Sequence, residues 1–392
     1  MNARARALAI ASVFLFTLGA LRAQAQPAPF EINVMISMSG AAAFLGKEQV
    51  ETYTILEKVV NRSGGIAGRP VKFVFHDDQS SPQVGLQLVN EMISRKVPVI
   101  IGSSFAAVCN AVAPLVKNNG PVLYCLSPGI HPAPGGYVFA SSVSTRDIAA
   151  VMLRYLRERK WNRIAIITTT DQSGQDFETA FNAGLTVREN AALQVVEREH
   201  FAPGDISVGA QMARIKAGNP QALFAWGVGT PFGTLLQGIT ESGIQVPTLS
   251  SNGNMISAQL SQYARYIPDQ LYFPGTTVLA RGQTRPGPMR DKQAAFYDAF
   301  DRAGIKPDNP NNTAWDPANL IVDAFRRLGT SATAQQIRDF IRDQHGWVGI
   351  NGVYDYADAE QRGIGGYAIV IYRYDAKAGA FIPSSRPGGT LR

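Results

Sequence analysis

The triplet His76, Asp77 and Asp78 is the group in this sequence whose residue types could most readily do chemistry. Such a triplet could form part of a metal site or act as an acid and base pair. No second histidine or cysteine stands at the spacing that a metal site requires. The triplet ends a run of β-forming residues and precedes Pro82, which favours the start of a helix. A short acidic side chain at such a junction can cap backbone amides, so we interpret the triplet as structural.

Other signatures of catalysis are missing from the sequence. The chain has four histidines, and none lies in an H-E-x-x-H arrangement. It contains neither a G-x-S-x-G elbow nor a phosphate loop that ends in Gly-Lys-Ser or Gly-Lys-Thr. The sequence therefore predicts a protein that is not an enzyme, holds no metal and needs no cofactor.

Residues 1–25 have the pattern of a secretory signal peptide. Arginines precede an apolar run over 7–21, and Ala-Gln-Ala follows at 23–25. The run is shorter than the roughly 20 residues that a membrane-spanning helix needs. We therefore expect cleavage after Ala25 and a mature protein outside the cytoplasm; the alternative is an uncleaved membrane anchor.

Length and composition suit a soluble protein of two domains. The 392 residues exceed a typical single core, and 45% of them are hydrophobic and 17% charged. The formal net charge of +7 is mild, and the sequence contains no run of Lys and Arg. We therefore expect no nucleic-acid partner. The two cysteines, Cys109 and Cys125, could form a disulfide in an oxidising compartment, or could remain buried thiols.

Short apolar runs alternate with longer amphipathic runs through most of the chain. This alternation predicts right-handed βαβ crossovers and parallel sheets that are covered on both faces. The expected strands of two successive units cover 30–38, 71–77, 97–102, 121–127, 162–170, 192–201, 221–227 and 246–251. Expected helices over 292–304, 317–329 and 333–344, a hairpin over 346–363 and a strand over 367–375 must pack onto these units, because they lack a complete sheet of their own.

Four stretches carry a resemblance to a known family. They are Ser39-Gly40 with Phe44-Leu45-Gly46, then GGIAGRPVKFVFHDDQSSP over 64–82, VPVIIG leading to GPVLYCLSPG, and NRIAIITTTDQSGQD over 162–176. In order and spacing they resemble the type I periplasmic binding proteins, specifically the Leu/Ile/Val-binding-like receptors of ABC importers. The resemblance implies an α/β fold of two Rossmann-like lobes with parallel central sheets, joined by a hinge that the chain crosses several times. Lobe 1 would comprise 26–143 and 276–350, and lobe 2 would comprise 144–275 and 351–392.

The resemblance also implies a function and its partners. We expect a monomeric periplasmic receptor that closes around a small-molecule solute and delivers it to the membrane permease subunits of an ABC importer. One alternative is an amino-acid receptor of the same family. Others are a periplasmic ligand sensor without a transport role and a periplasmic hydrolase of small amides or esters.

Ligand contacts are expected just after the strands, because the carboxyl ends of parallel strands in both lobes would face one cleft. In the family the helix start at 105–107 holds a ligand carboxylate, where free amides and the helix dipole favour an anion. Alanines replace the family's hydroxyl cluster there, although Ser104 could supply a hydroxyl. The candidate ligand-binding residues are Phe44, Leu45, Ser104, Phe105, Ala106, Ala107, Ser127, Gly129, His131, Ser173, Trp226, Gly229 and Asn252.

The nature of the solute follows from the positions that depart from the amino-acid receptors. Asn252 stands where those receptors have a glutamate for the ammonium group, and a neutral amide cannot compensate a buried cation. His131 takes the position of a threonine and could donate to a carboxylate. Phe44, Phe105 and Trp226 could flank a flat or apolar body. The sequence therefore predicts a small organic anion, such as an aromatic carboxylate, as the ligand.

Overall fold

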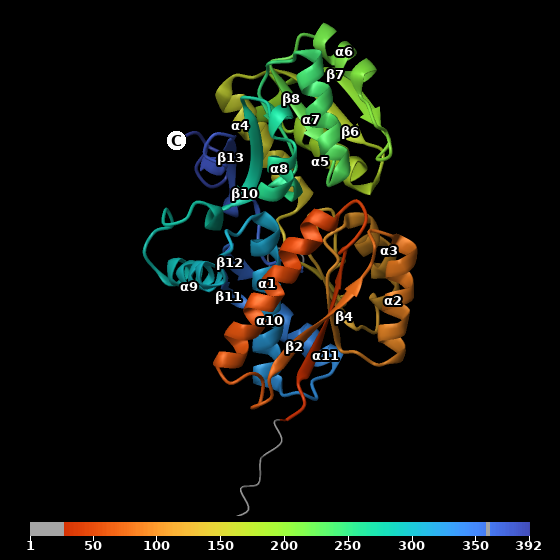
Figure 1. Ribbon diagram of the computed structural model, residues 1–392, viewed down its shortest axis with the longest axis vertical. Helices are drawn as coiled ribbons and strands as arrows, with labels where there is room; N and C mark the ends of the chain where they lie inside the picture. Colours follow the sequence, from red (N-terminus) through yellow and green to blue (C-terminus); the bar gives the residue numbers. More distant parts are fainter. Residues whose placement is uncertain (1–26, 358–360) are drawn as a thin grey trace, which may run out of the picture.

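The computed structural model of the chain describes residues 27–357 and 361–392. Two sheets, each covered by helices, lie one above the other and form two lobes (Figure 1). The expected signal peptide lies outside the described residues. Within the described ranges, no helix has the length and apolarity that would let it cross a membrane.

The lower lobe is built on a parallel sheet of five strands in the order β2-β1-β3-β4-β5. Val34 on one face packs in a cluster with the helices α1, α10 and α11, whereas Met35 on the other face packs on α2 and α3. Both faces are thus buried, which explains the continuous apolar runs of these strands. The elements are β1 (Phe30–Ile36), α1 (Ala43–Arg62), β2 (Val71–Asp77), α2 (Pro82–Ser94), β3 (Val99–Ile101), α3 (Ala106–Val116), β4 (Val122–Cys125), β5 (Val138–Ala140), α10 (Asn309–Leu328) and α11 (Ala334–Arg342).

The upper lobe is built on a sheet of seven strands in the order β14-β13-β10-β9-β8-β6-β7. The strands from β7 to β10 are parallel, and β13 and β14 add an antiparallel edge. Helices α4 and α5 cover one face and α6 and α7 the other. The elements are α4 (Thr145–Arg159), β6 (Arg163–Thr169), α5 (Gln172–Leu185), β7 (Gln194–Phe201), α6 (Gly209–Ala217), β8 (Ala222–Trp226), α7 (Thr230–Ser242), β9 (Thr248–Leu249), α8 (Ser257–Gln262), β10 (Leu271–Thr276), β13 (Ile369–Asp375) and β14 (Ala380–Pro383).

The triplet that opened the sequence analysis holds loops together at the end of β2. Asp77 accepts hydrogen bonds from the amides of Met38 and Ser39 and from the Ser39 hydroxyl. Asp78 accepts from the Ser37 hydroxyl and from the amide of Ser80. Within the described residues no cluster of three or more His, Cys, Asp or Glu could hold a metal ion. The hydrogen bonds that Asp77 and Asp78 accept confirm the structural interpretation for these two aspartates.

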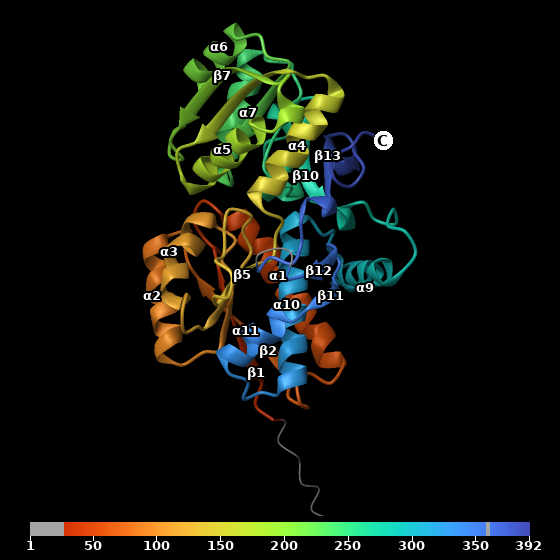
Figure 2. The ribbon, with the colours of Figure 1, turned by 180° about the vertical axis from the view of Figure 1, so that it is seen from behind.

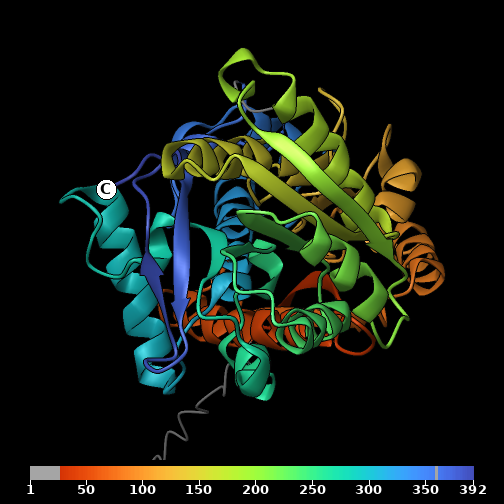
Figure 3. The same cartoon turned by 90° about the horizontal axis from the view of Figure 1, so that it is seen from above.

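The chain passes between the two sheets after β5, after β10 and after the hairpin β11 (His345–Val348) and β12 (Val353–Asp355). Seen from behind, this hairpin and α9 (Pro288–Ala303) flank the lower lobe beside α10 (Figure 2). Seen from above, the blue C-terminal strands lie at one edge of the upper sheet and the yellow-green strands at the other (Figure 3). The side chains of Gln361 and Arg362 donate to carbonyls of the lower lobe. The residue limits of the two lobes stay a prediction.

Several elements differ from the sequence-based expectation: β5, α8 and β14 were not expected, and α10 and β10 differ for reasons that the structure shows. Helix α10 begins at Asn309, eight residues before the expected start at Pro317, because Pro317 is accommodated inside the helix. The Asp308 side chain and Asn311 form a capping box at its start. Strand β10 was not expected at all, because it contains Pro274 and Gly275, which normally disfavour a strand interior.

Candidate functional site in the cleft between the lobes

A cavity lies between the two lobes where the strands β3, β4, β6 and β8 end. The cavity is partly enclosed and partly open to solvent. Its walls are Leu45, Gln49, Ser104, Phe105, Ala106, Leu126, Ser127, Pro128, Gly129, Thr145, Ser173, Asp176, Trp226, Val228, Ser251, Asn252, Gly253, Asn309, Pro310 and Thr313. Nine predicted ligand-binding positions are in this wall: Leu45, Ser104, Phe105, Ala106, Ser127, Gly129, Ser173, Trp226 and Asn252.

The start of helix α3 faces this cavity without a side-chain cap. Phe105 is the N-cap residue, and its backbone is extended (φ −86°, ψ 116°). No side chain accepts a hydrogen bond from the first helical amides. The side chains of Ala106 and Ala107 contain no hydrogen-bond acceptor. Free amides at a helix start carry a partial positive charge, so they suit a carboxylate. The Ser104 hydroxyl, predicted as a ligand contact, donates to Gln49 Oε1 at 3.1 Å.

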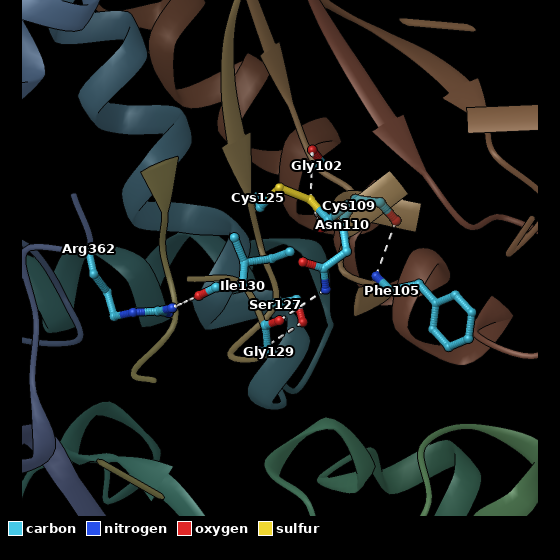
Figure 4. Close-up of a disulfide and its surroundings, with 10 residues drawn as sticks. Gly102, Phe105, Cys109, Asn110, Cys125, Ser127, Gly129, Ile130 and Arg362 are labelled. Atoms are coloured by element: carbon cyan, nitrogen blue, oxygen red, sulfur yellow. Dashed lines mark hydrogen bonds between the residues drawn. A yellow bond between two sulfur atoms is a disulfide. The ribbon is translucent and has the colours of Figure 1, made fainter. Parts of the chain in front are cut away.

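A disulfide joins helix α3 to the end of strand β4 in the lower lobe, next to the cleft. Cys109 lies in the first turn of α3 and Cys125 ends β4, and their Cα atoms are 6.3 Å apart. Both cysteines are fully buried. Figure 4 shows the disulfide beside the loop that contains Ser127 and Gly129. The covalent link therefore fixes the helix start relative to the neighbouring loop.

The loop after β4 is held by hydrogen bonds from three directions. Ser127 Oγ accepts from the amide of Gly129 at 3.2 Å, and Asn110 Nδ2 donates to the Gly129 carbonyl at 3.1 Å. Arg362 donates to the carbonyl of Ile130 (Figure 4) and also to that of Pro128. This loop is thus positioned by α3 on one side and by the late chain segment on the other.

His131 reaches across the cleft instead of lining the cavity. Its Nε2 lies 2.6 Å from Oδ1 of Asp176, which belongs to α5 in the upper lobe. The side chain of His131 is 39% exposed and that of Asp176 only 10%. The pair therefore bridges the two lobes at the mouth of the site, a role that the sequence did not indicate for His131.

Gly229 also lies at the contact between the lobes and not in the cavity wall. Its backbone has φ 78° and ψ −134°, a conformation that is essentially restricted to glycine. A Cβ atom at this position would lie 2.1 Å from the Ala41 carbonyl oxygen of the lower lobe. The amide of Thr230 donates to the same oxygen at 3.3 Å. The absence of a side chain thus allows the two backbones to meet.

Most of the other predicted residues lie either in the cavity wall or in contacts beside it. The indole of Trp226 is buried and stacks on Phe177, with ring centroids 3.7 Å apart and planes 8° apart. The carbonyl of Asn252 accepts from Asn309 Nδ2 at 3.0 Å, which is a further contact between the lobes. Phe44 packs against a small apolar cluster that includes Ile256 of the upper lobe. Neither Phe44 nor Ala107 is part of the cavity wall.

Sequence reasoning missed six polar residues in the cavity wall: Gln49, Thr145, Asp176, Ser251, Asn309 and Thr313. Two of them, Gln49 and Asp176, follow a predicted residue on the same helix by one turn: Gln49 is four positions after Leu45, and Asp176 is three after Ser173. Residues three and four apart share one face of a helix. Extending each predicted contact by one helical turn would have identified both.

A buried carboxyl group beside the cleft makes stability depend on pH. Burial, followed by the charges of Asp308 and Glu51, raises the pKa of Glu48 to about 7. The side chain lies in α1, and Asp308 bonds Ser257 of the upper lobe. Since the pKa in the folded protein exceeds the ordinary value of 4.5, the folded state binds this proton more tightly than the unfolded chain.

We expect the replacement Glu48→Gln to remove this dependence. The contribution of Glu48 is fully present below its unfolded pKa and is lost as pH rises through about 7. The variant should therefore be more stable than the parent at pH 8 by about 1–3 kcal/mol and nearly equal at pH 4.5. Urea unfolding at the two pH values measures the difference. An equal gain at both values would contradict the assignment.

Comparison with known proteins supplies independent information. A family model described as "Periplasmic binding protein" matches residues 29–379. The chain is 21% identical over 257 residues to a Leu/Ile/Val-binding protein of Escherichia coli K12. The aligned region covers 64% of this chain and 68% of that protein. An extracellular ligand-binding receptor from Rhodopseudomonas palustris HaA2 superposes with a TM-score of 0.77 at 22% identity, over 91% of this chain and 99% of the other. A solute-binding protein of an R. palustris ABC transporter, in complex with benzoate, superposes with a TM-score of 0.73 at 17% identity, over 91% and 95%.

Proposed function

This chain belongs to the periplasmic binding proteins, and we propose that it captures a small organic acid, such as an aromatic carboxylate, in the cleft between its lobes. Members of the family are solute-binding receptors that work with ABC transporter permeases. The observation that carries our proposal is the uncapped start of α3 in the cavity wall. Its free amides can hold a carboxylate without a cationic side chain.

The charge pattern of the cavity supports an acid as the ligand. No lysine or arginine is in the described cavity wall, so backbone amides must supply the positive potential. The carboxylate of Asp176 is already paired with His131. The hydroxyls of Ser127 and Ser173 and the amide of Asn252 are further polar groups in the same wall.

The apolar part of the cavity supports a flat or branched ligand body. Leu45, Phe105, Leu126, Trp226 and Val228 provide aliphatic and aromatic surface in the wall. Benzoate is the ligand named for one of the R. palustris structures. An acid with an apolar body could bind the helix start with its carboxylate and pack its body against these side chains.

An amino acid is the second candidate, and Asp176 favours it. Asn252 cannot neutralise an ammonium group, but Asp176 places a carboxylate in the same cavity from a different element. The E. coli relative is named as a Leu/Ile/Val-binding protein.

We also propose the setting in which the receptor works. The signal peptide would be removed after Ala25, and the mature protein would act as a monomer in the periplasm. It would release its ligand unchanged to the permease of an ABC importer, without catalysis. The lobes would be formed by 26–143 with 276–350 and by 144–275 with 351–392.

A ligand screen by thermal unfolding tests the proposed ligand class. We expect at least one acid without an amino group to raise the unfolding temperature in a panel of benzoate, hydroxybenzoates, short aliphatic acids and leucine. A ligand at 100 times its Kd stabilises the folded state by about 2.7 kcal/mol. Stabilisation by leucine, with none by any acid that lacks an amino group, would overturn the proposal in favour of an amino-acid receptor.

A further inference from the structure

We infer that the ligand carries a hydrogen-bond donor, a hydroxyl or an amino group, in addition to its carboxylate, and that Asp176 is the residue that selects it. The inference rests on the proposed function, because it assumes that an acid occupies the cavity between the lobes. It adds a requirement that the helix start alone does not impose.

Asp176 presents one carboxylate oxygen that the protein leaves without a partner. Oδ1 is bound to His131 at 2.6 Å, whereas Oδ2 is buried and has no hydrogen-bond partner. The side chain is 10% exposed and belongs to the cavity wall. Leaving a buried acceptor of this kind unpaired is unfavourable, and more so when it is charged. A ligand that donates a hydrogen bond to Oδ2 removes this cost.

Oδ2 lies close to the backbone of Gly129 and to the start of α3. Gly129 of the lower lobe faces it, and a Cβ atom on Gly129 would lie 3.2 Å from Oδ2 and 3.4 Å from Ala106 Cβ. The amide of Gly129 already donates to Ser127 and does not serve Asp176. Asp176 is thus close to the start of α3, where the ligand carboxylate is proposed to bind.

Two unpaired donors in the same wall complement this unpaired acceptor. Gln49 Nε2 and Trp226 Nε1 are both buried and have no partner. The Ser104 hydroxyl occupies Gln49 Oε1, which leaves the Nε2 end of that amide unpaired. A plain carboxylic acid offers acceptors to these donors but nothing to Asp176. An acid that also bears a hydroxyl or amino group can satisfy both kinds of site.

The position of Asp176 also links ligand choice to closure. Its two oxygens would serve different partners, Oδ1 the His131 side chain of the lower lobe and Oδ2 the ligand. A donor-bearing ligand would therefore bind the side chain that connects the lobes.

Calorimetric titration with matched ligands tests the inference. The first series is benzoate, its three hydroxy isomers and 4-aminobenzoate; the second is 4-methylpentanoate, its 2-hydroxy derivative and leucine. The best donor-bearing member should bind at least about tenfold tighter than its parent acid, since one net hydrogen bond to a charged group is worth about 1.5–3 kcal/mol. Tighter binding by the hydroxyl or by the amino member then shows which donor the site takes.

Two variants separate selection from a structural role. In Asp176→Leu, the ratio of the Kd of the parent acid to the Kd of its best donor-bearing derivative should be close to one. His131→Ala breaks the bridge between the lobes but keeps Oδ2, so it should weaken parent and derivative alike and preserve the ratio. Equal binding of parent and derivatives by the unmodified protein, or an unchanged ratio in Asp176→Leu, would overturn the inference while leaving the proposed function intact. Binding of no acid in either series, or of leucine alone, would instead refute the proposed function, and this inference with it.

Discussion

Replacing Gly229 by alanine should weaken ligand binding by at least about 100-fold while the protein remains folded. In the closed arrangement the new Cβ atom would lie 2.1 Å from the Ala41 carbonyl oxygen, a separation that non-bonded atoms do not tolerate. The contact joins the two lobes, so the lobes must separate to relieve it. A ligand that needs both walls then binds only the small closed fraction. Titration calorimetry with the ligand found by thermal screening measures the loss.

A second glycine controls for backbone strain. Gly282 also has φ +78°, but no atom would lie within 4 Å of an added Cβ. Gly282→Ala should therefore lower stability through strain alone and leave the affinity nearly unchanged. Equal affinities of Gly229→Ala and the unmodified protein would show that ligand binding does not require this contact. A loss of the same size in Gly282→Ala would point to a general effect on folding.

Removing the disulfide should produce the largest loss of stability among these changes. The bond closes a loop of 16 residues, and a loop of this length corresponds to about 3 kcal/mol in the chain-entropy description. The double replacement Cys109→Ala with Cys125→Ala should lower the free energy of unfolding by about this amount. Because the bond also fixes the start of α3 relative to the loop after β4, ligand affinity should fall as well.

Reducing agent provides the matched control for the disulfide prediction. It should lower the unfolding temperature of the unmodified protein toward that of the double variant and should leave the double variant unchanged. Equal stability of the two proteins under oxidising conditions would contradict a stabilising role for the bond.

The alternation of strands and helices could be predicted because both sheets are buried on both faces. Apolar runs such as 30–38 and 162–170 therefore stood out against amphipathic helices in the sequence. The antiparallel edge of the upper sheet could not be predicted from the sequence. Strand β10 contains a proline and a glycine, and its partner β13 lies about 100 residues later in the chain. Local pattern cannot reveal a pairing over that distance.

The cavity wall could be predicted where it consists of loops that directly follow strands. Ser104 and Ser127 lie in such loops, whereas Ser173 lies in the first turn of α5 and Asn252 begins a short 3-10 helix after β9; all four lie in the wall. Local position does not indicate which residues meet the opposite lobe. The pairing of His131 with Asp176 and the fit of Gly229 against Ala41 both depend on the closed arrangement of two separately folded sheets. These contacts became visible only in the structure.

A crystal structure of the protein with the acid that stabilises it most would test the central claim most directly. We predict that the ligand lies unaltered between the lobes, with its carboxylate at the free amides of the α3 start beside Ala106 and its body against Trp226. Electron density for the ligand on an outer surface, or a ligand held by one lobe alone without these amides, would contradict the account.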